Sequence, residues 1–195
     1  MKTPNFNFLL LNLILSFLPI YLSTFPKLRS LSSNQSKIII DYIGEGNPKV
    51  INDDFGDKPD IIYFNGSNFT IDSIKSLQLG NGTNEFILIW NHKLTDCSKM
   101  FKDSDNISKI DFSDFDTSEV TDMSEILNGC KNLVSLNLSN FGISKVINIS
   151  RMFKGCSKIS SLNLNSLNTS KVIDMSEMFN GCTNLLSINM NNFNT

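Results

Sequence analysis

Apolar residues in the C-terminal half of the chain recur at a spacing of 26 residues. Four segments come into register at that spacing, without a gap: 94–119, 120–145, 146–171 and 172–195. A Gly-Cys pair holds one phase in three of them, at Gly129-Cys130, Gly155-Cys156 and Gly181-Cys182. A fixed period in the twenties predicts a solenoid, because one unit cannot bury its apolar face alone and must stack on the next. The last unit has only 24 residues and lacks a polar end, so we expect the chain to be a fragment or to be capped by another chain.

The second half of each unit carries the spacing L-x-x-L-x-L, as at Leu133, Leu136 and Leu138. Alternation around the last two leucines is typical of a short strand with one buried face. The polar residues that alternate with the apolar ones are predicted to point outward as one nearly uncharged surface. They are Lys109, Asp111, Ser113, Ser135, Asn137, Ser139, Ser161, Asn163, Asn165, Ser187, Asn189 and Asn191.

Two interpretations of this surface stay open. It is a candidate binding face, because an extended sheet surface is a common site of recognition in repeat proteins. Alternatively, the Asn and Ser side chains only solvate the sheet and form hydrogen bonds along the stack. We prefer the second interpretation for any single residue and the first for the surface as a whole.

The first half of each unit has apolar residues at steps of three and four, which predicts a short helix. In the final unit they are Val172, Met175, Met178, Phe179 and Cys182. Asp174 and Glu177 are spaced as a capping box, and Gly181 supplies a left-handed stop. The predicted fold class is therefore an α/β solenoid of coils with about 26 residues, each a short strand plus a short helix. The Met and Phe positions are predicted to form its core rather than a ligand pocket.

Residues 31–93 do not follow the period. Three apolar runs, Ile38–Ile40, Ile61–Phe64 and Phe86–Trp90, are separated by turn-forming residues and predict short strands. We expect a β-rich N-terminal cap or degenerate repeats. An acidic group in this region suggests either a calcium site or a solvated loop: Asp53, Asp54, Asp57 and Asp60. The solvated loop is preferred, because the spacing lacks the register of a calcium-binding loop.

Residues 1–30 are predicted to form a signal peptide, with Lys2 before an apolar run and small polar residues after it. An uncleaved membrane anchor is the alternative, because the run is almost long enough to span a bilayer. Pro19 and Ser23 favour cleavage, so we expect the chain to be secreted or on the cell surface. Eight N-x-Ser/Thr triplets are then possible glycosylation sites if the source is eukaryotic and have no significance if it is bacterial. They begin at Asn34, Asn65, Asn68, Asn81, Asn106, Asn137, Asn148 and Asn168.

The residues that could support metal or catalytic chemistry are few. Cys130, Cys156 and Cys182 share one phase and would stack about 5 Å apart, within reach of a bridge. Their apolar surroundings favour buried thiols instead, and Cys97 also falls at a core phase. No paired C-x-x-C spacing suggests zinc, and the single histidine, His92, belongs to no catalytic motif. We expect no enzymatic activity, no cofactor and no metal.

The string M-S-E-M-F-N-G-C-T-N-L-L-S-I-N-M-N-N-F-N-T, at 175–195, resembles the repeat of BspA-like leucine-rich-repeat surface proteins. The string F-D-T-S-E-V-T-D-M, at 115–123, resembles the related mycoplasma lipoprotein repeat. The resemblance covers about residues 94–195, and some copies depart from it, as where Ile126-Leu127 replaces Met-Phe. It implies an extracellular leucine-rich-repeat protein that acts in adhesion without catalysis.

The expected partner is a protein or glycan of a host, matrix or cell surface. A net charge of −2 argues against nucleic acid. Membrane contact is expected only through the N-terminal segment or through an anchor that would follow Thr195. The alternative function is a structural coat or spacer protein without a specific ligand.

Overall fold

Eight strands and one short helix form the regular structure of residues 35–193, the part of the chain that the computed structural model describes. The expected signal peptide at 1–30 and the possible glycosylation site Asn34 lie outside these residues. Within the described range, no helix is both long and apolar enough to cross a membrane.

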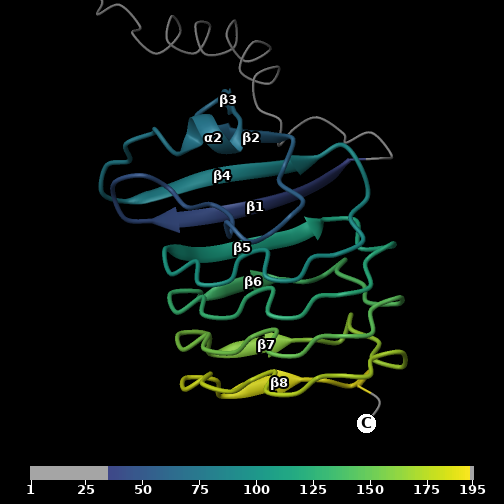
Figure 1. Ribbon diagram of the computed structural model, residues 1–195. Helices are drawn as coiled ribbons and strands as arrows, with labels where there is room; N and C mark the ends of the chain where they lie inside the picture. Colours follow the sequence, from purple (N-terminus) through teal and green to yellow (C-terminus); the bar gives the residue numbers. More distant parts are fainter. Residues whose placement is uncertain (1–34, 194–195) are drawn as a thin grey trace, which may run out of the picture. The chain divides into compact units, whose positions relative to one another are not determined.

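The first six strands form one mixed sheet in the order β3-β2-β4-β1-β5-β6 (Figure 1). The strands are β1 (Ser36–Ile43), β2 (Ile61–Phe64), β3 (Ser67–Phe69), β4 (Thr83–Trp90), β5 (Ile107–Asp114) and β6 (Ser135–Asn137). The three apolar runs of residues 31–93 lie in β1, β2 and β4. Every residue of the β1 and β4 runs is buried, whereas in β2 only Ile62 is. Strand β1 is antiparallel to both β4 and β5, whereas β5 and β6 are parallel.

The helix α2 (Ile71–Ile74) has only four residues and follows β3 directly. It begins at a capping box, in which Thr70 and Ser73 each accept a hydrogen bond from the backbone of the other. Its buried residue, Ile74, anchors it to the core.

A second, two-stranded sheet pairs β7 (Ser161–Asn163) with β8 (Ser187–Asn189) in parallel. The four repeats are also joined by isolated parallel bridges that link Asp96 to Asp122, Asp122 to Asn148, and Asn148 to Asp174. Each bridge joins residues 26 positions apart, so neighbouring repeats stack in the register of the sequence period.

The predicted α/β solenoid of strand-plus-helix coils is wrong. The structure is mostly a mixed β-sheet, and the first halves of the described repeats form turns instead of helices. Residues at the centre of these turns have left-handed backbones, with φ of 61° at Lys99, 57° at Glu125, 56° at Arg151 and 55° at Glu177. A right-handed helix cannot pass through such a residue.

Backbone hydrogen bonds explain why turns replace helices. An α-helix directs every N–H to the carbonyl four residues earlier in the same segment. Here alternate N–H groups bond to the next repeat, from Glu125 to the Ser150 carbonyl (2.9 Å) and from Leu127 to the Met152 carbonyl (3.1 Å). The Ile126 N–H between them bonds within its own repeat, to the Met123 carbonyl three residues back at 3.4 Å. The apolar steps of three and four therefore reflect consecutive tight turns that stack on their neighbours.

One hydrophobic core runs from the N-terminal strands through the repeats. Its aromatic residues form a chain of contacts, in which Phe112 lies 5.7 Å from Phe115 and 4.8 Å from Phe141 between ring centroids. Further along, the rings of Phe153 and Phe179 stack at 5.8 Å. The Met and Phe residues of the turns thus fill the space behind the strands and leave the opposite surface of the strands free.

Candidate functional site

The polar residues of the repeat strands lie beside one another from repeat to repeat. Lys109 pairs with Ser135 and Asp111 with Asn137 across β5 and β6. The Ser-Leu-Asn tripeptide of β7 pairs residue for residue with the Ser-Ile-Asn tripeptide of β8. We call the twelve residues that the sequence singled out the strand face. Seven of them are exposed: Ser135, Ser139, Ser161, Asn163, Ser187, Asn189 and Asn191. The other five are half-buried: Lys109, Asp111, Ser113, Asn137 and Asn165.

Side-chain hydrogen bonds order the first half of the strand face. Asn137 Nδ2 donates to Asp111 Oδ1 at 3.0 Å, and the Ser113 N–H donates to the same oxygen at 2.9 Å. Burial raises the pKa of Asp111, but the hydrogen bonds from Ser113 and Asn137 outweigh it and hold that pKa below its usual value. Asp111 is therefore an ionised carboxylate whose Oδ1 accepts hydrogen bonds from its own strand and from the next repeat.

Similar side-chain bonds to the backbone recur further along the strand face. The Asn137 carboxamide oxygen accepts from the Ser139 N–H at 3.1 Å, and Asn163 accepts from Asn165 in the same way at 3.2 Å. The Asn165 oxygen accepts from the Asn191 N–H of the next repeat at 3.1 Å. These oxygens hold the loops that follow the strands and leave several amide nitrogens for other partners.

The strand pairing is interrupted between β6 and β7. Where β6 begins, the Val134 N–H donates to the Ser108 carbonyl at 2.9 Å, and where β8 begins, Leu186 donates to Ser160 at 2.9 Å. Within residues 35–193, no corresponding bond joins Ser160 to Val134, and β6 and β7 belong to different sheets. The turns of these two repeats stay joined, as described for Glu125 and Leu127, so the gap opens only on the strand side.

A pocket of about 410 Å³ lies at this interruption, on the strand face. Its lining residues are uncharged: Leu136, Asn137, Leu138, Ser139, Asn163, Asn165 and Ser166. Five of these seven carry amide or hydroxyl groups, and the two leucines add a small apolar surface. The arrangement can bind a neutral ligand that has both polar and apolar groups.

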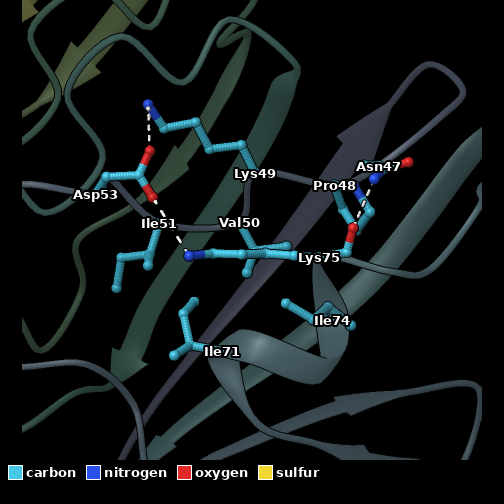
Figure 2. A pocket seen from close by; sticks show the side chains of 9 residues that line it. All are labelled: Asn47, Pro48, Lys49, Val50, Ile51, Asp53, Ile71, Ile74 and Lys75. Atoms are coloured by element: carbon cyan, nitrogen blue, oxygen red, sulfur yellow. Dashed lines mark hydrogen bonds and ion pairs between the residues drawn. The ribbon is translucent and has the colours of Figure 1, made fainter.

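A second pocket, of about 310 Å³, lies between α2 and the loop after β1 (Figure 2). Two ammonium groups approach Asp53 from opposite sides, with Lys49 Nζ at 3.4 Å and Lys75 Nζ at 3.9 Å. Lys75 is also 3.9 Å from Asp72. Because the two lysines already face two carboxylates, this pocket has no surplus charge for an ionic ligand.

The acidic group of the N-terminal region is divided between separate contacts. Asp53 faces the lysines of the second pocket, whereas Asp57 and Asp60 face His92. His92 Nε2 lies 3.0 Å from Asp57 Oδ1, and its Nδ1 lies 3.5 Å from Asp60 Oδ2. Among residues 35–193, no three His, Cys, Asp or Glu side chains are grouped so as to hold a metal ion.

The cysteines are free thiols that join neighbouring repeats. Cys130, Cys156 and Cys182 each donate Sγ–H to a backbone carbonyl 29 residues earlier, at 3.1, 3.2 and 3.0 Å. Burial raises the pKa of Cys156 to about 12 and also raises the pKa of Cys97 and Cys130. Protonated, buried thiols are poor nucleophiles and poor metal ligands.

Charged residues of the repeats pair with one another away from the pocket. Lys145 Nζ lies 2.6 Å from Glu119, and Arg151 Nη2 lies 2.7 Å from Glu177, each pair joining residues 26 positions apart. These ion pairs match charge between successive repeats. The strand face differs from these surfaces because, beyond β5, its members are all neutral.

The described glycosylation candidates differ in accessibility. Five are exposed: Asn65, Asn68, Asn81, Asn106 and Asn168. The half-buried Asn137 and Asn148 instead donate their amide nitrogens to Asp111 and Asp122, at 3.0 and 3.4 Å. The exposed sites are therefore the ones that a glycan could reach without breaking a bond between repeats.

Sequence reasoning missed Ser166 and the two leucines as residues of a pocket, because it did not foresee the interruption. Both β6 and β7 have the sequence Ser-Leu-Asn, so the strands themselves carry no signal that their pairing is broken.

Residues 95–195 match the family model described as "Mycoplasma protein of unknown function, DUF285". No curated protein and no solved structure gave a significant match to the chain.

Proposed function

The chain belongs to the DUF285 family of mycoplasma proteins of unknown function, and we propose that it is a non-enzymatic surface protein. In this proposal it binds a host, matrix or cell-surface partner through its strand face. The family assignment is consistent with a surface protein. The finer resemblance of 175–195 to BspA-like surface proteins supports a role in adhesion.

One observation carries the proposal: polar side chains of paired strands lie in register, those of β5 beside β6 and those of β7 beside β8, and all of them beyond β5 are neutral. The Ser and Asn residues of β7 lie beside those of β8, and Ser135 and Asn137 of β6 lie beside residues of β5. A surface of repeated amides and hydroxyls can form many hydrogen bonds with one extended partner, each worth about 0.5–1.5 kcal/mol net. Such a surface suits a protein or a glycan better than a nucleic acid, which needs a basic surface.

An extracellular location is part of the proposal. The predicted signal peptide at 1–30 supports secretion or surface display, and any membrane contact would pass through that segment or through an anchor beyond Thr195. The proposal requires no cofactor and no metal.

Attachment of the full chain to cultured eukaryotic cells tests the proposal. Beads coated with the chain should attach, and substitution of Asn137, Asn163 and Asn189 by Ala should reduce attachment severalfold. The matched control replaces Ser144 and Ser170, two exposed residues outside the strand face, by Ala. Thermal unfolding measured in parallel shows that each variant is folded. Equal attachment by the strand-face variant and the control would contradict the proposal.

A structural coat or spacer is the second candidate, and exposed apolar residues favour it. Ile173 is 84% exposed, Leu186 is 89% exposed and Ile147 is 48% exposed. Exposed apolar side chains promote association of protein surfaces. If the chain is a coat component, the wild-type chain should self-associate in sedimentation experiments and should not attach to cells. The double variant Ile173→Ser, Leu186→Ser should no longer self-associate.

A further inference from the structure

The pocket between β6 and β7 brings together several hydrogen-bonding groups that have no partner in the described residues. Within residues 35–193, neither Asn163 Nδ2 nor Asn165 Nδ2 has a hydrogen-bond partner, and neither do the Ser139 and Ser166 hydroxyls. One repeat earlier, the equivalent nitrogen of Asn137 donates to Asp111. In β8, where the pairing with β7 is unbroken, Asn189 Nδ2 likewise has no partner among the described residues. What distinguishes the pocket is that four such groups line one hollow.

The geometry of the stack excludes an inserted peptide strand as the occupant. A strand that paired with both β6 and β7 would separate them to about twice the usual strand spacing of about 4.8 Å. The turns of the same two repeats are held at a single spacing, since the Met123 N–H donates to the Asn148 carbonyl at 2.9 Å and Gly129 donates to Lys154 at 2.7 Å. The occupant must instead rest in the pocket from the open side.

The lining favours a neutral, hydroxylated ligand. Amide nitrogens donate to hydroxyl oxygens, and serine hydroxyls both donate and accept, so the four free groups match a ring that carries several hydroxyls. Leu136, which is half-buried, offers an apolar surface to the C–H groups of such a ring. A charged ligand would lose its hydration without gaining a counter-charge from any lining residue.

We infer that the pocket between β6 and β7 binds a neutral sugar residue of a glycan, with Asn163, Asn165, Ser139 and Ser166 as its hydrogen-bonding groups. The inference rests on the proposed function, because it names the ligand class for one part of the strand face. The volume of about 410 Å³ accommodates a single sugar ring together with part of a neighbouring ring.

Nuclear magnetic resonance of the isotope-labelled full chain tests the inference. Galactose, glucose and N-acetylglucosamine serve as neutral probes, and glucuronate serves as the charged comparison. At least one neutral sugar should shift the side-chain amide signals of Asn163 and Asn165 in a saturable manner. Removing two hydrogen bonds with Asn163→Ala and Ser166→Ala should weaken binding by about tenfold. The matched control is Asn189→Ala, at the same position one repeat later and outside the pocket lining, which should bind as wild type does.

The inference is overturned if no neutral sugar shifts these signals, if the Asn189→Ala control loses as much affinity as the pocket variant, or if glucuronate binds more tightly than glucose.

Cell attachment separates this inference from the proposed function. Attachment that depends on the strand face and persists after enzymatic removal of cell-surface glycans overturns the sugar site and leaves the adhesion proposal standing. Sugar binding with attachment that is insensitive to the strand face overturns the adhesion proposal instead.

Discussion

Asn137 donates its side-chain amide to the carboxylate of Asp111, which lies 26 residues earlier on the neighbouring strand, at 3.0 Å. Asn163 holds the same position one repeat later, but its amide nitrogen has no partner within the described residues. Replacing Asn137 by Ala should lower the free energy of unfolding by about 1.5 kcal/mol, the lower end of the range for a bond to a charged group, because the site is half-buried.

Asn163→Ala is the matched control for that substitution and should change stability by about 0.5 kcal/mol or less. Urea denaturation of both variants provides the comparison. Equal losses in the two variants would show that the bond between Asn137 and Asp111 contributes nothing to the stacking of the repeats.

Gly129 has a left-handed backbone, with φ of +78°, where β-carbons are disfavoured. A β-carbon there would lie 2.3 Å from Asp103 Oδ1 and 3.3 Å from Asp103 Cα, so the preceding repeat would have to move. Gly129→Ala should cost about 3 kcal/mol, from backbone strain and overpacking together.

Gly46→Ala separates the two contributions. Gly46 has φ of +86°, yet an added β-carbon would meet nothing within 4 Å, so only strain of about 1–2 kcal/mol applies. Both variants are measured by thermal or urea unfolding. A Gly129→Ala loss no greater than that of Gly46→Ala would contradict the close contact between the first two repeats.

The thiols should differ in reactivity toward a maleimide. Cys97, Cys130 and Cys156 are fully buried, and burial raises the pKa of each, so their thiolate fraction and access are both small. Cys182 is half-buried and should react first in the native chain. Mass spectrometry of the labelled peptides measures the order of reaction. Rapid labelling of Cys130 without unfolding would contradict the packing described for the repeats.

Glu177 should make stability depend on pH in a defined window. Hydrogen bonds from Arg151 and Lys154 lower its pKa from the usual 4.5 to about 2 in the folded chain. Because the pKa of Glu177 is lower in the folded chain than in the unfolded chain, its ionised form stabilises the fold at any pH above the unfolded-state pKa. That stabilisation is lost as the pH falls from the unfolded-state pKa through the folded-state pKa. Wild type should therefore lose more stability than Glu177→Gln between pH 4.5 and pH 2. The measurement is the melting temperature of both proteins as a function of pH. Equal decreases in melting temperature for wild type and Glu177→Gln over this range would show that the ion pairs do not persist in solution.

The sequence period carries the long-range register but not the local conformation. It places Asp122 and Asn148 in one phase, and the structure pairs them. It also suggested helices, because apolar steps of three and four fit a helix as well as a series of tight turns. What decides between them is the bonding of alternate N–H groups to the next repeat, which is a tertiary effect. Glu125 and Arg151 adopt left-handed backbones without being glycine, so their residue types give no warning.

The candidate site was partly accessible to sequence reasoning. Alternation around Leu136 and Leu162 predicts which residues point away from the core, and of the twelve that it selects seven are exposed and five are half-buried. The pocket was not accessible, because it depends on a broken pairing between two strands of identical sequence. Only the positions of the backbone groups reveal it.

Hydrogen–deuterium exchange of the full chain, free and bound to plasma-membrane vesicles from cultured cells, tests the role of the strand face most directly. The account predicts slower exchange on binding in the segments 135–139 and 161–166, which form the strands and loops around the pocket. It predicts no change in the turns at 145–153, which lie away from the strand face. Protection confined to those turns, or bound chain without protection of either strand segment, would contradict the account.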